Sequence, residues 1–372
     1  MNEYMGLINQ VRSLPELIRN QYEDLERKTR SALSTPEIFK VMRVTLTGCG
    51  DSYAASLAVR DAFASLTGLA VDVIPSIELS RSYDRSFFGW APLNPLVIAV
   101  SNSGSVARVA EAISRASTYG AFTLGVTGNR KSPLAEASSR ILDLDIPSFE
   151  AAPGTRSYVV SVLALLLLAI RIGEVRGRYS MDEAMRMRLD ILSQADELER
   201  LLPSIESEMK ELSIRWADLD GYDFIGTGME FGSAWYAHAK VLEMLGKYSS
   251  YKNSEDWLHT NLFLRNNHKT GTLVFSDDRN GAYGRTEELI GYASKLERPL
   301  LVIGDTDEDV PSIRTPKTEY LFNSALTDFT PVNILLNHIA NAIGEEDGRG
   351  CKGVWKIADG AKCIRESEIR IL

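Results

Sequence analysis

Residues 41–53 read VMRVTLTGCGDSY, an apolar run that ends in a glycine-rich turn. The run at 41–47 predicts a buried strand, and the pattern from Tyr53 to Leu66 predicts a helix after it. The turn Gly48-Cys-Gly-Asp-Ser52 joins the two, because glycine lets the backbone turn sharply and lets a ligand approach it closely. This strand–turn–helix unit is typical of α/β proteins.

The same alternation of strands and helices continues through the first half of the chain. A helix is predicted at 106–119, and further strands are predicted at 70–74, 96–100, 122–126 and 141–144. These strands are almost continuously apolar, as strands are when helices cover both faces of a parallel sheet. The first half therefore predicts a doubly wound parallel sheet.

The second half of the chain repeats this plan, with strands predicted at 222–225, 271–275 and 299–303. Gly48 and Gly226 each open a Gly-x-Gly turn and are 178 residues apart, and Ser101 and Ser276 each end a strand and are 175 residues apart. This spacing indicates an internal duplication. We divide the chain into a helical arm, a first domain, linker helices, a second domain and a tail, at residues 1–30, 31–178, 179–218, 219–345 and 346–372. Pro203 is the expected joint within the linker helices.

Composition narrows the class of protein. The chain has 41 Lys and Arg against 50 Asp and Glu, a net charge of −9, so it lacks the basic surface that nucleic acids attract. Three cysteines without CxxC spacing predict neither a disulfide framework nor a zinc site. The apolar run Tyr158–Ile170 is too short to span a bilayer and predicts a buried helix. We therefore expect a cytoplasmic protein without metal, cofactor, nucleic acid or membrane partner.

Two hydroxyl-rich clusters lie where a strand is followed by a helix. One is Gly50-Asp-Ser52, and the other is Ser101-Asn-Ser-Gly-Ser105. Hydroxyls, backbone N–H groups and a helix N-terminus together suit an anion such as phosphate. The first cluster alone is also compatible with a plain tight turn or a dinucleotide site, and the second with a helix N-cap. Two clusters in the same half favour the anion site.

Two further patterns in the second half carry ionisable groups. Lys240 and Glu243 are three residues apart and share one face of a predicted helix, which by spacing alone favours a surface ion pair. Glu255 and Asp256 precede His259 by four and three residues. That pattern is either a solvated helix turn or a carboxylate that fixes the tautomer of a histidine for proton transfer.

Taken together, these motifs resemble the sugar isomerase (SIS) domains of the glucosamine-6-phosphate synthase family, over about residues 30–350. The resemblance implies two tandem flavodoxin-like, five-stranded parallel sheets. It also implies that the sugar phosphate is held by Ser52, Ser101, Asn102 and Ser103, within loops that include Gly50, Asp51 and Ser105. Val106 stands where the family has a threonine, and Ser105 is the expected replacement for that hydroxyl.

The same resemblance assigns catalytic roles in the second half. Lys240 and Glu243 match a K-x-x-E motif, with Glu243 moving a proton between C1 and C2 of the sugar. His259 is expected to open the sugar ring, and a lysine of the tail, Lys352 or else Lys362, to form an imine with the ketose. The resemblance also implies a homodimer in which a histidine reaches the neighbour's site.

We therefore expect a phosphosugar isomerase-type enzyme for a ketose or amino-sugar 6-phosphate. The synthases begin with a glutaminase domain, whereas this sequence starts MNEYM, so we expect no use of glutamine. Aldose–ketose isomerisation, deamination and deglycation remain open as the net reaction. The alternative is a protein that senses a phosphosugar without converting it, and such a sensor would need neither Glu243 nor His259.

Overall fold

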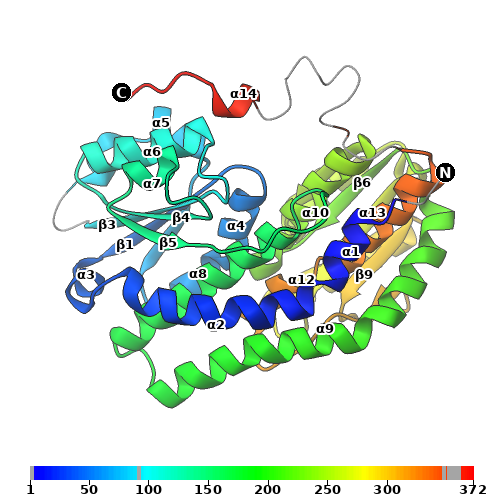
Figure 1. Ribbon diagram of the computed structural model, residues 1–372. Helices are drawn as coiled ribbons and strands as arrows, with labels where there is room; N and C mark the ends of the chain where they lie inside the picture. The colour runs from blue at the N-terminus through cyan, green and yellow to red at the C-terminus, as the bar shows by residue number, and fades with distance from the viewer. Residues whose placement is uncertain (1–3, 90–93, 346–348, 350–361) are drawn as a thin grey trace. The chain divides into compact units, whose positions relative to one another are not determined.

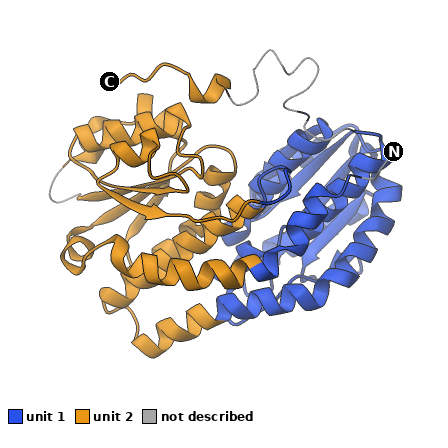
Figure 2. Cartoon of the chain, in the orientation of Figure 1, with its two compact units in different colours: residues 1–16, 149–155, 190–352 blue, residues 17–148, 156–189, 353–372 orange. Residues whose placement is uncertain are grey.

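The computed structural model describes residues 4–89, 94–345, 349 and 362–372, which form two compact units. We call the unit of residues 17–148, 156–189 and 353–372 the first, because it holds the first sheet of the sequence; it is orange and keyed as unit 2 in Figure 2. The second comprises residues 1–16, 149–155 and 190–352, which are blue and keyed there as unit 1. Each unit contains one parallel sheet, and each gathers segments that are far apart in the sequence.

The sheet of the first unit has five strands in the order β2-β1-β3-β4-β5, and every neighbouring pair is parallel (Figure 1). Val44 lies between Val71 and Leu96 in this register. The order is that of flavodoxin-like folds, in which the chain changes direction across the sheet between β1 and β3. The strands are β1 Arg43–Thr47, β2 Ala70–Val73, β3 Pro95–Val100, β4 Phe122–Thr127 and β5 Arg140–Asp143.

Helices cover both faces of this sheet. On one face α4 packs against α8, and on the other a core formed by Leu79, Phe88, Val97 and Ile113 joins α5 and α6 to the strands (Figure 1). The helices of this unit are α2 Leu14–Ala32, α3 Thr35–Lys40, α4 Asp51–Thr67, α5 Ser76–Arg81, η1 Arg85–Phe88, α6 Ala107–Thr118, α7 Pro133–Ala137, α8 Arg156–Val175 and α14 Lys362–Arg365.

Helix α8 contains the longest apolar run of the sequence. Its 20 residues are long and apolar enough to cross a membrane, but 83% of the apolar window is buried inside the structure. Every residue from Tyr158 to Ile170 is buried. The prediction of a buried helix is therefore confirmed, since burial in the core accounts for its apolar composition.

The second unit repeats the topology. Its strands lie in the order β10-β9-β8-β6-β7, which is the same flavodoxin-like order read from the opposite edge, and the reversal falls between β6 and β8. The duplication and the predicted fold class are thus confirmed. The strands are β6 Gly221–Ile225, β7 Tyr248–Lys252, β8 Thr270–Ser276, β9 Leu300–Gly304 and β10 Ser312–Ile313.

Helix α1, near the start of the chain, belongs to the second unit and packs against α13. Leu7 of α1 donates its backbone N–H to Asn337 Oδ1 at 3.2 Å. The helices are α1 Gly6–Arg12, α9 Met181–Trp216, η2 Gly228–Glu230, α10 Phe231–Leu245, α11 Ser254–His259, η3 Asn261–Phe263, η4 Asn267–Lys269, α12 Tyr283–Lys295, η5 Leu321–Leu326 and α13 Thr330–Ala342.

Pro203 does not break the linker helix, contrary to the sequence prediction. Helix α9 runs without interruption through Pro203. Leu198, Leu202, Ile205 and Met209 are buried along one face of it, at helical spacing. Burying each of these side chains contributes roughly 1.5–3 kcal/mol, which together outweighs the ~3 kcal/mol that an internal proline costs.

Candidate functional site

The reversal of strand order in the first unit brings the two hydroxyl-bearing loops together. Strands β1 and β3 are direct neighbours, with Thr47 opposite Ala99 at their carboxyl ends. The turn at 48–50 follows β1 and the loop at 101–106 follows β3, so both leave the same edge of the sheet side by side. In open α/β sheets, ligands bind at this switch point.

The turn after β1 depends on a serine that sequence reasoning missed. Ser76 Oγ donates to the carbonyl of Gly48 at 2.7 Å and lies 3.2 Å from Thr47 Oγ1. Gly50 has a φ of +55°, a conformation that favours glycine, and it is the N-cap of α4. Ser52 follows in the first turn of that helix, where it is partly exposed. The first cluster is therefore held open at a helix N-terminus.

The loop after β3 is closed by its own hydroxyl groups. Ser101 Oγ accepts the N–H of Gly104 at 3.2 Å, and Ser105 Oγ donates to Ser103 Oγ at 3.0 Å. Gly104 has a φ of +64°, and a Cβ there would lie 2.0 Å from Ser132 Oγ. The chain therefore requires glycine at this position to bring the loop against its neighbours.

Neither cluster provides a side chain that caps a helix. Val106 is the N-cap residue of α6 and Gly50 that of α4, and within the described ranges neither helix has a side-chain hydrogen bond at its N-cap. The N-cap interpretation of the second cluster is thus wrong. Asn102 is exposed, and the first N–H groups of a helix are the groups that an anion at its N-terminus would use.

Arg108 supplies a positive charge that the sequence reasoning did not single out. It lies in the first turn of α6, and its charge acts on Cys49 in the turn after β1. Burial raises the pKa of the Cys49 thiol, while a hydrogen bond with Ser76 and the Arg108 charge oppose that rise. A basic residue directly after a hydroxyl-rich loop was the available signal.

The end of the chain lies against the same helix. Arg108 donates to the carbonyl of Glu368, and Arg115 donates to the carbonyl of Leu372 at 2.9 Å. Of the two predicted tail lysines, Lys352 falls outside the described residues. Lys362 is half exposed, and its Nζ lies 3.7 Å from a carboxylate oxygen of Glu366, which follows α14.

In the second unit, Lys240 and Glu243 form an ion pair that is not a surface pair. The Lys240 side chain is 0% exposed, its Nζ lies 2.7 Å from Glu243 Oε2, and it sits 4.9 Å from the ring centroid of Tyr236. The Glu243 side chain is 43% exposed. Spacing alone therefore misjudged the pair, since a buried ammonium group orients a carboxylate that solvent and ligands can reach.

His259 ends helix α11 and pairs with Glu255 rather than Asp256. His259 Nε2 lies 2.9 Å from Glu255 Oε1, and Arg285 donates to the other oxygen at 2.7 Å. The hydrogen bond from Arg285, followed by that from His259, holds the pKa of Glu255 below its ordinary value. Asp256 instead accepts from Asn253 at 2.9 Å. Both side chains are exposed, at 72% for His259 and 56% for Glu255, so the pair lies on a solvated helix turn.

Comparison with known families agrees with this geometry. Residues 37–171 match the SIS domain. This part of the chain is thus similar to SIS domains. The isomerizing glutamine–fructose-6-phosphate aminotransferase of Gloeobacter violaceus is 24% identical over 245 residues, which is 64% of this chain and 39% of that protein. The chain spans about two-fifths of the length of the first curated relatives that it matches.

Solved structures extend the likeness to both sheets. The tagatose-6-phosphate ketose/aldose isomerase of Escherichia coli has a TM-score of 0.71 at 18% identity, covering 91% of this chain and 93% of that one. The glucosamine-6-phosphate deaminase of Thermotoga maritima has a TM-score of 0.64 at 20% identity, covering 89% and 95%. These likenesses show the fold, so the tandem arrangement of two SIS-type sheets is shared.

Proposed function

We propose that this chain is a phosphosugar isomerase-type enzyme that acts on a ketose or amino-sugar 6-phosphate. The observation that carries the proposal is the pair of hydroxyl-bearing loops, with two helix N-termini, at the switch point of the SIS sheet. A phosphate dianion is the small-molecule group that such an arrangement suits best. The net reaction is aldose–ketose isomerisation, amino-sugar deamination or deglycation.

In this proposal the phosphate is bound by the first unit. Ser52 offers a hydroxyl beside the start of α4, and the segment Ser101–Ser105 offers hydroxyl, amide and backbone N–H groups beside α6. Gly50 and Asp51 lie at the junction of the turn after β1 with α4, and the charge of Arg108, which is ion-paired with Glu111 at 2.6 Å, acts on the turn. Charge-assisted hydrogen bonds to phosphate of this kind are short and strong.

Proton transfer is proposed for the second unit. Glu243 would take a proton from one of the carbons C1 and C2 and return it to the other through an enediol, and Lys240 would hold that carboxylate in place. His259, with its ring fixed by Glu255, would move the proton that opens the sugar ring, in a homodimer as the family resemblance implies. Each well-placed acid or base contributes roughly 10²–10⁴-fold to the rate.

A phosphosugar sensor is the second candidate function. It would share the phosphate loops and would bind without conversion. The buried lysine beneath a half-exposed glutamate favours the enzyme, because binding of a phosphate does not need a buried ammonium group that positions a carboxylate. The two candidates therefore differ in what happens after binding.

The test combines binding with turnover. Thermal unfolding is measured with fructose 6-phosphate and glucosamine 6-phosphate, with the unphosphorylated sugars as controls, and NMR then follows the best ligand over time. Binding at 100 times Kd should stabilise the chain by about 2.7 kcal/mol. Conversion by the natural chain, together with binding but no conversion by Glu243→Gln, supports the enzyme. Binding without conversion supports the sensor, and stabilisation that does not require the phosphate contradicts both.

A further inference from the structure

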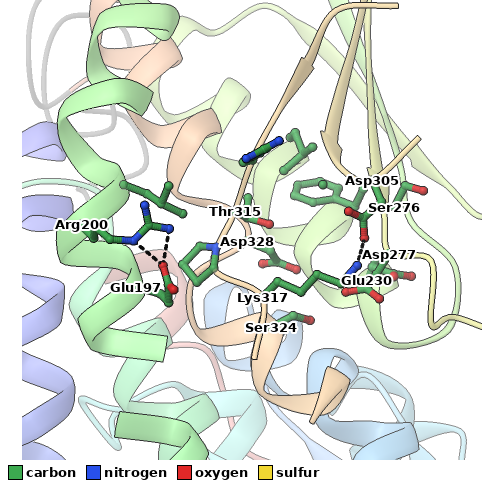
Figure 3. A pocket seen from close by; sticks show the side chains of 16 residues that line it. Glu197, Arg200, Glu230, Ser276, Asp277, Asp305, Thr315, Lys317, Ser324 and Asp328 are labelled. Atoms are coloured by element: carbon green, nitrogen blue, oxygen red, sulfur yellow. Dashed lines mark hydrogen bonds and ion pairs between the residues drawn. The ribbon is translucent and has the colours of Figure 1, made fainter. Parts of the chain in front are cut away.

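The second sheet has a cavity at the carboxyl ends of its strands, next to its switch point. The cavity holds about 360 Å³, within the range of small-molecule sites, and lies at the carboxyl ends of β8 and β9. Figure 3 shows its polar side chains, with carboxyl groups gathered around the Lys317 side chain. The groups used below are Glu230, Ser276, Asp305, Lys317, Ser324 and Asp328. All of them belong to the second unit.

The internal repeat shows how this cavity differs from the switch point of the first sheet. The 178-residue spacing places Glu230 where the first half has Ser52. The 175-residue spacing places Asp277 where the first half has Asn102. Neutral groups that suit an anion are thus replaced by carboxylates, which repel an anion and attract a cation. The second cavity is therefore not a second phosphate site.

Two buried carboxylates at the cavity have no cationic partner among the described residues. Glu230 is 4% exposed, its Oε2 accepts from Asn280, and its Oε1 has no hydrogen-bond partner there. Asp328 is 5% exposed and accepts from Ser233 Oγ at 2.8 Å on both oxygens. Burial and the charge of Asp328 raise the pKa of Glu230. An added cation would relieve both effects.

Two buried hydroxyl groups at the same cavity also lack partners. Ser276 is 6% exposed and Ser324 is 9% exposed, and neither Oγ has a hydrogen-bond partner within the described part of the chain. A buried polar group without a partner is unfavourable by about 1–3 kcal/mol, so such groups point to a ligand that completes them. Hydroxyl groups on the ligand would do so, because a hydroxyl both donates and accepts.

The cavity suits an organic cation better than a metal ion. Asp277, Asp278 and Asp305 have carboxylate oxygens within 4.8 Å of one another. However, Lys317 Nζ already lies 2.8 Å from Asp278 and 2.7 Å from Asp305. The place of a metal ion is thus taken by an ammonium group. The unpartnered atoms, Glu230 Oε1 and the two serine Oγ atoms, are not among the carboxylate oxygens of this cluster.

We propose that this cavity binds a small amine-bearing polyol of the amino-sugar type. The ammonium group lies by the carboxylates of Glu230 and Asp328, and hydroxyl groups of the ligand pair with Ser276 and Ser324. This site does not use the phosphate loops of the first unit. Its test can therefore fail while the proposed function holds, and the reverse is also true.

The test uses the full chain and an unphosphorylated ligand. Glucosamine is titrated near neutral pH by calorimetry, with glucose as the matched neutral sugar, so that the phosphate loops are not engaged. Glucosamine should bind at least tenfold more tightly than glucose. Glu230→Gln and Asp328→Asn should each weaken glucosamine binding at least tenfold, while Asp309→Asn, at an exposed carboxylate, should leave it unchanged.

Several results would overturn the proposal. These are the absence of glucosamine binding, equal binding of glucose, or unchanged glucosamine binding in both carboxyl variants. Tighter binding of Mg²⁺ than of glucosamine, lost in the same variants, would also overturn it. Circular dichroism checks that the variants are folded. If neither carboxyl variant is folded, the double variant Ser276→Ala and Ser324→Ala takes their place in the test. It keeps both carboxyl groups and should weaken glucosamine binding severalfold, and unchanged binding would overturn the proposal.

Discussion

Asp328 is a carboxyl group whose ionisation should weaken the folded protein. It is buried, and burial raises its pKa from the ordinary 3.8 to about 7. The folded chain thus holds this proton more tightly than the unfolded chain does. Stability should fall as pH rises from about 4 to about 7 and stay low above that, because the unfolded state ionises first. Asp328→Asn removes this dependence.

The size of the effect follows from the shift. A rise of the pKa from 3.8 to about 7 corresponds to roughly 4 kcal/mol. This is the upper bound for the free energy of unfolding that Asp328→Asn gains near pH 8. The amide still accepts the hydrogen bond from Ser233, so the two proteins should be nearly equal in stability near pH 4. Removing the charge of Asp328 also makes Glu230 easier to ionise, which acts in the same direction.

Urea denaturation of the natural chain and of Asp328→Asn, at several pH values between about 4 and 8, measures this difference. The variant should gain about 2–4 kcal/mol relative to the natural chain across that range. Asp309→Asn controls for the loss of one carboxylate at an exposed position. A difference between the two proteins that does not change with pH would refute the reasoning, because the buried carboxyl would then not titrate within that range.

Three further predictions concern residues outside this cavity. Gly104→Ala should destabilise the chain by about 2 kcal/mol or more in urea denaturation, because its φ is +64° and the new Cβ would meet Ser132 at 2.0 Å. Ser34→Ala should cost about 1 kcal/mol in the same assay, since Ser34 forms a capping box at the start of α3. Lys240→Met should slow sugar-phosphate conversion at least tenfold in the NMR assay, because Glu243 loses the group that orients it. Its stability should change by only about 1 kcal/mol, since methionine fills the same space and the remaining carboxylate reaches solvent.

Most of the fold could be predicted because the central strands are buried on both faces. Strand β3 is a continuous apolar run and β4 is largely buried, and the predicted ends of both lie within one residue of the observed ones. Strand β7, with the sequence YSSYK, was missed because it lies at a sheet edge and carries polar side chains, and β10 has only two residues. Edge strands have a weak apolar signal because solvent covers part of them.

The residues of the candidate site could also be predicted only in part. Each phosphate loop is a single continuous stretch of sequence, so its hydroxyl groups could be recognised before the structure was known. The burial of Lys240 could not, since spacing places two residues on one face without saying which face is covered. Glu230 and Asp328 are almost 100 residues apart, and only the fold brings them to one cavity. The repeat nevertheless carried a signal, because it aligned Glu230 with Ser52.

The two switch points show what duplication preserves and what it changes. The strand order, which fixes where a ligand can enter, is the same in both sheets. The side chains at that place are not, since a serine in one half corresponds to Glu230 in the other. Buried carboxylates without a cation lower the stability of the fold, and Asp328→Asn is expected to restore part of that stability. A chain that keeps Glu230 and Asp328 in the lining of a ligand-sized cavity is best explained by a ligand that needs them, and two buried carboxyl groups favour a cation as that ligand.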